Sequence, residues 1–152
     1  MHLSPNIFYN HCYGKYAIAA VNVFTMEQVL GLFSAGARAN APFIVQITPA
    51  ARNYAHPEML IGMIHAASKI YPKAVYSVHM DHGNEEHAFN AIESNDYDSI
   101  MIDASHDNFD GNVKRTKAVV KEAHKKNIVV EAELGVLSGV EDDLSIDEKH
   151  AK

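Results

Sequence analysis

The sequence predicts an α/β fold whose parallel strands form part of a (β/α)8 barrel. Apolar segments that read as strands alternate with helical segments at intervals of roughly 25–35 residues, a rhythm typical of βαβ units. In each predicted strand one face is apolar, while the other carries polar groups that gather toward the C-terminal end. An open sheet with helices on both faces would bury those carboxylates, whereas a barrel turns one face inward and builds its site at the C-terminal rim. We therefore predict a TIM barrel.

The first predicted strand, residues 16–23, is expected to be buried, and a helix follows it from Thr25 to about Arg38. Thr25 and Gln28 have the spacing of a capping box, in which side chains and backbone bond reciprocally at the start of a helix. Later segments repeat this order. Strands are predicted at 42–48, 75–81, 99–105 and 128–134, and helices from Pro57 to about Ile70, from a cap at Asn84 to about Ser94, and from about Phe109 to Lys126.

The polar face of these strands is the informative one. It carries Asn22, Gln46, Thr48, Ser77, His79, Asp81, Asp103, Ser105, Glu131 and Glu133. A barrel interior with only a structural role is dominated by Val, Ile and Leu, so this interior indicates a ligand or a metal.

Eight strands need roughly 250 residues, whereas this chain has 152 residues and five predicted strands. We expect residues 1–152 to be the N-terminal portion of a single TIM-barrel domain, covering about its first five strands.

Composition narrows the classes of partner. The net charge of −6 argues against nucleic acid or an anionic membrane surface as a standing partner. The single cysteine, Cys12, excludes an internal disulfide and fits a reducing compartment, so a cytoplasmic location is expected. No apolar run approaches the ~20 residues that span a bilayer.

The strand ends predict metal chemistry. Asp81, His82, Asp103 and Glu133 end different strands and are expected to converge at the rim, where imidazole and carboxylates suit Zn²⁺ or another divalent metal. A catalytic zinc usually takes three protein ligands. His82 is the only histidine at a predicted strand end that is expected to face the rim, so at least two further ligands would come from outside the visible chain. The alternatives are that His82 caps the next helix or bonds a carbonyl. Asp103 and Glu133 fit a carboxylate–lysine network equally well.

Proton transfer is the second expectation. Asp81 ends its strand on the other side of the backbone from His82, and it suits either a proton shuttle or a buried aspartate that positions a loop. His79, a layer deeper, is interpreted as a core histidine that orients Asp81. No predicted strand ends in lysine, which disfavours Schiff-base chemistry. The segment 135–150 is expected to be a mobile acidic loop that could deliver a general acid or base, or simply a surface loop.

Four motifs, in this order and spacing, together resemble the class II fructose-bisphosphate aldolases. They are "HMDHG" (79–83), "SIMIDASH" (99–106), "AVVKEAH" (118–124) and "VVEAELGVLSGVEDD" (129–143). The segments "GKYAIAAVNV" (14–23) and "APFIVQIT" (41–48) look like the first two strands of the family. The resemblance covers almost the whole chain from about Gly14 onward.

The resemblance implies a role for each matching position. Asp81 matches the proton-transferring aspartate, and Glu141 matches a glutamate of a mobile loop that takes part in proton transfer. His82 matches the first histidine ligand of the catalytic metal, usually zinc. Asp103 and Glu133 match the carboxylates of a second, more buried metal position. A monovalent cation is a further candidate cofactor.

Substrate contacts follow by the same resemblance. Thr48 falls where a hydroxyl commonly contacts substrate, and Asn22 where an asparagine lies near the glyceraldehyde-phosphate end. The implied reaction is reversible cleavage of fructose 1,6-bisphosphate to dihydroxyacetone phosphate and glyceraldehyde 3-phosphate, in a homo-oligomer (dimer or tetramer). The remaining histidine ligands and the phosphate loop of the family would lie beyond Lys152, so the isolated chain is expected to be inactive. A tagatose-1,6-bisphosphate aldolase, a non-catalytic metal-binding half-barrel and a Schiff-base aldolase are the alternatives.

Overall fold

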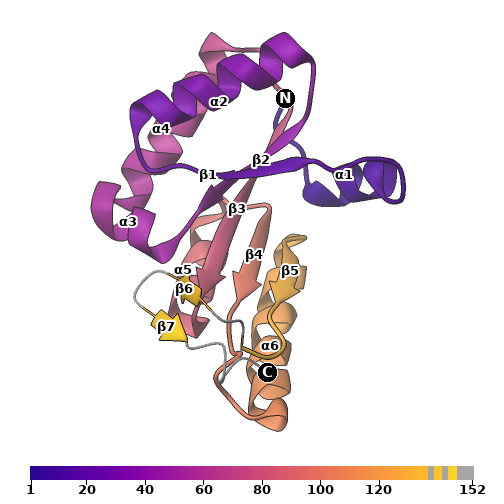
Figure 1. The fold of residues 1–152 in the computed structure, drawn as a ribbon, viewed down its shortest axis with the longest axis vertical. Coiled ribbons are helices and arrows are strands. Elements are labelled where there is room, and N and C mark those ends of the chain that lie inside the picture. Colours follow the sequence, from indigo (N-terminus) through magenta and orange to yellow (C-terminus); the bar gives the residue numbers. More distant parts are fainter. Residues whose placement is uncertain (137–138, 142–143, 147–152) are drawn as a thin grey trace.

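The computed structural model describes residues 1–136 and the backbone of two further short strands, Gly139–Glu141 and Leu144–Ile146. Its centre is a five-stranded parallel sheet in the order β1-β2-β3-β4-β5 (Figure 1). The sheet therefore follows the order of the sequence, as expected for the first strands of a barrel. The strands are β1 (Ala19–Asn22), β2 (Phe43–Ile47), β3 (Tyr76–Gly83), β4 (Ser99–Ile102) and β5 (Val129–Ala132).

Helices connect the strands, and the four predicted helices are confirmed. Thr25 and Gln28 do form the predicted capping box, and the Asn84 side chain accepts a hydrogen bond from the His87 amide. Two short helices, α1 and α3, were not predicted. The helices are α1 (Pro5–Cys12), α2 (Met26–Ala39), α3 (Pro49–Ala55), α4 (Pro57–Ile70), α5 (Glu85–Ser94) and α6 (Phe109–Ala123), which is extended by the 3-10 turn η1 (His124–Lys126).

The hydrophobic core lies between the apolar face of the sheet and the helices that cover it. Val45, Val78 and Ile100 in the central strands are fully buried or nearly so. They belong to one cluster with Phe33 of α2 and Val119 of α6. The polar face is turned away from these helices, and α1 approaches it from the other side, where the Tyr9 hydroxyl donates to Glu131. The predicted apolar face is confirmed in β2, β3 and β4, whose residues supply the core cluster.

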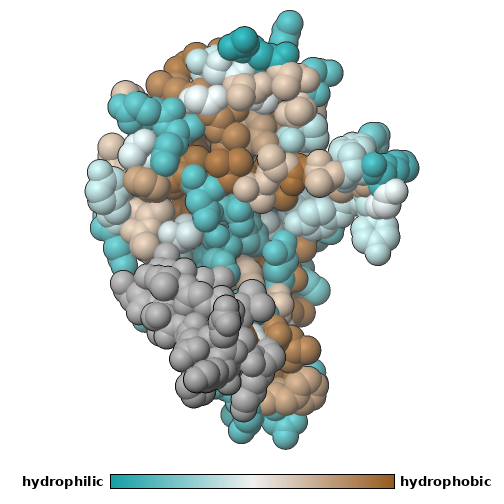
Figure 2. Space-filling model, in the orientation of Figure 1, coloured by the Kyte–Doolittle hydropathy of each residue, from teal (hydrophilic) through white to brown (hydrophobic). Residues whose placement is uncertain are grey.

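The expectation that the first strand is buried is wrong. All of β1 is exposed, and only Val23, directly after it, is buried. The physical reason is position: β1 lies at an edge of the sheet and pairs with β2 alone among the described strands. Figure 2 shows hydrophobic surface in the region where Figure 1 draws β1.

The segment expected to be a loop contains a hairpin. β6 (Gly139–Glu141) pairs antiparallel with β7 (Leu144–Ile146). The rest of that segment from residue 137 onward lies outside the described residues. Among the residues described, no helix is long and apolar enough to cross a membrane.

Candidate metal and proton-transfer site

The end of β3 departs from regular strand geometry where the candidate site begins. Pairing with β4 shifts between Met80 and Gly83, which marks a bulge or irregularity. His82, inside this shift, has a φ of 45°, a left-handed conformation that is uncommon for residues other than glycine. Strict alternation would turn His82 to the face that carries Met80. The irregularity instead brings the imidazole to the rim, beside Asp81.

Three side chains from three strand ends come together at this rim. His82, Asp103 and Glu133 each offer a ligand atom, and these atoms all lie within 4.8 Å of one another. The His82 Nδ1 atom is 3.7 Å from Glu133 Oε2, and the Glu133 side chain is only 11% exposed. One imidazole and two carboxylates form a donor set suited to a first-row divalent cation. The structure thus brings together the three residues that the sequence indicated as metal ligands.

Asp81 lies next to this group and is almost fully buried. Its Oδ1 atom is 3.7 Å from His82 Nε2 and 3.9 Å from His79 Nε2. The other ring nitrogen of His79, Nδ1, is 2.7 Å from the Ser99 hydroxyl. Burial lowers the pKa of His79, although the nearby Glu131 and Asp81 carboxylates act in the opposite direction. Asp81 therefore lies between the rim imidazole and a deeper one whose pKa burial lowers.

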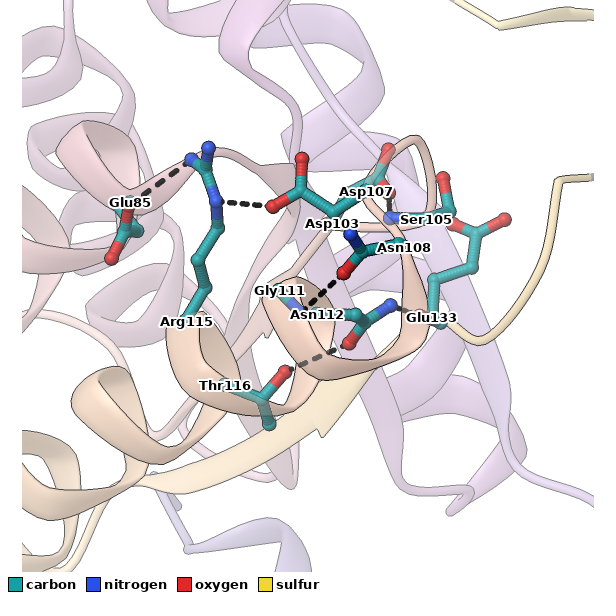
Figure 3. Close-up of polar contacts among 10 residues, drawn as sticks. All are labelled: Glu85, Asp103, Ser105, Asp107, Asn108, Gly111, Asn112, Arg115, Thr116 and Glu133. Atoms are coloured by element: carbon teal, nitrogen blue, oxygen red, sulfur yellow. Dashed lines mark hydrogen bonds and ion pairs between the residues drawn. The ribbon is translucent and has the colours of Figure 1, made fainter.

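Hydrogen bonds fix the Asp103 side chain and the Glu133 main chain (Figure 3). The Asp103 Oδ1 atom accepts a hydrogen bond from the Ser105 amide at 2.9 Å, a local turn that restricts the side chain. The Asn112 side-chain amide donates to the Glu133 main-chain carbonyl at 2.8 Å. Sequence reasoning did not identify Asn112. Its position in the sequence could have indicated burial, because Asn112 lies on the same face of the predicted helix as Val119, which is buried.

The three remaining predicted site residues lie at the ends of three other strands. Asn22 is exposed at the end of β1. Thr48 directly follows β2, and its hydroxyl accepts a hydrogen bond from the Ala51 amide at 3.0 Å, so that it caps α3. Glu141 ends β6, and its side chain lies outside the described residues. Asn22 and Thr48 thus mark the rim on adjacent strands.

Comparison with protein families gives one match that covers almost the whole chain. Residues 6–152 match the family described as fructose-bisphosphate aldolase class-II. Two similar curated proteins carry the name fructose-bisphosphate aldolase. The one from Helicobacter pylori is 38% identical over 136 residues, which are 90% of this chain and 44% of that protein. The one from Giardia intestinalis is 38% identical over 130 residues, which are 86% of this chain and 40% of that protein.

Solved structures give the same result at the level of the fold. The crystal structure of the YdjI aldolase from Escherichia coli K12 superposes with a TM-score of 0.80 at 29% sequence identity. The match covers 89% of this chain and 52% of that one. The predicted fold class, a TIM barrel of which this chain provides about five strands, is confirmed. The chain spans about half the length of the relatives it matches.

Proposed function

The chain belongs to the class-II fructose-bisphosphate aldolase family, and from that premise we propose that the complete protein cleaves fructose 1,6-bisphosphate reversibly. The products are dihydroxyacetone phosphate and glyceraldehyde 3-phosphate. The observation that carries the proposal is the convergence of His82, Asp103 and Glu133 within 4.8 Å, with Asp81 beside them. A shared ancestor explains a similar fold, but a functional barrel also needs its polar groups together at the rim.

The donor set fits a divalent metal, for which we propose zinc. His82 would hold the catalytic ion, while Asp103 and Glu133 would hold it in a second, more buried position. When bound, such an ion polarises the ketose carbonyl as a Lewis acid. The fit rests on chemistry, because two carboxylates so close together repel each other and a cation between them removes that repulsion.

Asp81 is the proposed proton-transferring residue. A general base must lie within reach of the proton that it moves, and Asp81 adjoins His82 at a distance of 3.7 Å between side-chain atoms. The His79 imidazole lies on the inner side of Asp81, with its Nε2 atom 3.9 Å from Asp81 Oδ1.

The substrate contacts are proposed from the family alone. Thr48 and Asn22 end adjacent strands, which suits contacts along an extended sugar phosphate. Glu141 is proposed as the second proton-transferring residue. We also propose that residues 1–152 are the N-terminal portion of one barrel domain, that this portion alone is inactive, and that the complete protein is a cytoplasmic homo-oligomer.

The test is the aldol-cleavage rate of the complete protein with fructose 1,6-bisphosphate. We expect EDTA to abolish the rate and added Zn²⁺ to restore it, and tagatose 1,6-bisphosphate to react more slowly. A faster reaction with the tagatose epimer would reassign the substrate. Activity that resists EDTA and is trapped by borohydride would replace the proposal by Schiff-base chemistry.

A further inference from the structure

We propose that Asn112 is a positioning residue that sets the metal affinity of the rim by fixing the backbone at Glu133. This inference rests on the proposed function, because it assigns Asn112 a role in the same site. Asn112 reaches this site through the main chain of Glu133. It acts through one hydrogen bond, from its Nδ2 atom to the main-chain oxygen of Glu133 at 2.8 Å.

The position of Glu133 explains why such a bond matters. Glu133 directly follows the last residue of β5, so the ladder of the sheet no longer holds it firmly. Its amide reaches the Ile102 carbonyl at 3.4 Å, a long and weak hydrogen bond. Its carbonyl, by contrast, receives the short bond from Asn112. Fixing that carbonyl fixes the adjoining peptide plane, and with it the direction in which the Glu133 side chain leaves the backbone.

The Asn112 amide is itself held in one orientation. Its Oδ1 atom accepts a hydrogen bond from the Thr116 hydroxyl, one helical turn away, at 3.2 Å. With the oxygen occupied in this way, the NH2 group faces Glu133 (Figure 3). Asn112 is only 7% exposed. A buried amide with both ends bonded loses little by competition with water.

The helix that carries Asn112 is anchored to the rim. The Asn108 side chain caps its first turn by accepting from the Gly111 amide at 2.8 Å. Arg115 then bridges two segments: its Nε atom lies 2.6 Å from Asp107 and its Nη1 atom 3.1 Å from Glu85 of α5 (Figure 3). These contacts fix the start of α6 against the segment that follows β4, where Asp103 lies. The bond from Asn112 therefore fixes the position of the Glu133 backbone relative to Asp103.

The test measures metal affinity directly in the complete protein. Metal is removed with a chelator, and Zn²⁺ or Co²⁺ is titrated back in competition with a chromophoric chelator. Asn112→Leu keeps the volume and removes the amide, and we expect its Kd for the metal to be about 10–100-fold weaker. The visible absorption of bound Co²⁺ should also change, because a ligand is reoriented.

Asn108→Ala is the matched control. It removes a bond from the same end of α6 and lowers helix stability, but it leaves the Asn112–Glu133 bond in place. We expect its metal Kd to stay within about twofold of the wild type. A similar loss of affinity in both variants would mean that Asn112 only stabilises the helix, and would overturn the inference.

A double-mutant cycle tests the route through Glu133. In a Glu133→Gln background, Asn112→Leu should weaken metal binding by less than about twofold further. A full effect in that background, or a wild-type Kd in Asn112→Leu, would overturn the inference while leaving the proposed function intact. If the wild type binds no divalent ion, the proposed function fails and the inference fails with it.

Thr116→Val is the substitute variant if Asn112→Leu does not fold. It leaves the Asn112 amide free to rotate, and we expect metal binding to weaken by about threefold or more. An unchanged Kd for the metal would overturn the inference.

Discussion

At the scale of single residues, Asp81 is the side chain on which the proposed chemistry depends most. It is buried, with an exposed side-chain fraction of 7%, and it lies between the two imidazoles of His79 and His82. General acid–base groups typically contribute about 10²–10⁴-fold to a rate. We therefore predict that Asp81→Asn lowers kcat of the complete protein by about 10²–10⁴-fold with its metal content unchanged.

Steady-state kinetics and metal analysis of the purified variant provide the measurement. Asp110→Asn is the control, since Asp110 is exposed in the first turn of α6 and its loss should leave kcat unchanged. An Asp81→Asn variant that keeps wild-type kcat would remove Asp81 from the mechanism.

His79 makes stability depend on pH. Burial lowers its pKa in the folded state, so below the ordinary value of about 6.5 the unfolded chain binds more protons than the folded one. We predict that the free energy of unfolding falls as the pH drops below 6.5, by at most about 1.4 kcal/mol per pH unit for this one group. His87, whose pKa burial also lowers, acts in the same direction.

His79→Gln separates the contribution of His79, because glutamine cannot take up that proton and still offers a polar atom toward Ser99. Urea unfolding of both proteins between pH 5 and pH 7.5 should give a shallower pH dependence in the variant. Equal slopes would show that His79 is not the group responsible.

At the scale of elements, local signals predicted some helices and strands better than others. The capping box at Thr25 and the cap at Asn84 were found because each depends only on neighbouring residues. The short helices α1 and α3 carried such a signal too, a proline directly after Ser4 or Thr48, but their length of one to two turns gave no periodicity. The left-handed φ of His82 has no local signal, because pairing with β4 determines it.

Two glycines of α2 give a prediction at this scale. Gly31 has open space where a Cβ atom would lie, whereas at Gly36 that atom would be 2.3 Å from Cε1 of Phe43. The Phe43 ring cannot easily move aside, because its centroid lies 5.1 Å from that of the Phe33 ring and the residue is only 3% exposed. We predict that Gly31→Ala raises the free energy of unfolding by up to about 1 kcal/mol, and that Gly36→Ala lowers it by about 1–3 kcal/mol.

Urea denaturation of the two variants measures both effects, and each glycine serves as the control for the other. Since helix propensity is the same gain at both positions, opposite signs isolate the contact with Phe43. Equal stabilisation by both substitutions would mean that the Phe43 ring moves aside at little cost.

At the scale of the whole molecule, the sheet has two edges. Among the described strands β1 pairs only with β2, and β5 only with β4. Val21, in the exposed β1, has an exposed fraction of 37%. Open edges of this kind are templates for pairing between chains. We predict that the 152-residue chain, prepared alone, self-associates as its concentration rises, and that Val21→Lys reduces this association.

Light scattering coupled to size-exclusion chromatography gives the measurement. Tyr13→Lys is the control, because Tyr13 is 89% exposed but lies outside the sheet. If both lysine substitutions reduce association equally, general hydrophobic contact is responsible and the strand edge is not.

The fold class could be predicted because strand alternation is a property of each segment on its own. The same reasoning brought His82, Asp103 and Glu133 to one rim, since the carboxyl ends of parallel strands meet there. It could not predict the exposure of β1, which depends on which strands lie beside it. It also missed Asn112, whose role follows from packing between α6 and the end of β5.

The shift in pairing at the end of β3 has a consequence for how many neighbouring residues one strand can bring to the same side. Between Met80 and Gly83 the chain advances three residues while β4 advances only two, from Ile100 to Ile102. His82 is therefore out of step with the alternation that places Val78 and Met80 in the core and His79 and Asp81 on the opposite face. With regular pairing His82 would fall on the face that carries Met80, so the one-residue shift is what allows two neighbouring residues, Asp81 and His82, to lie together at the rim.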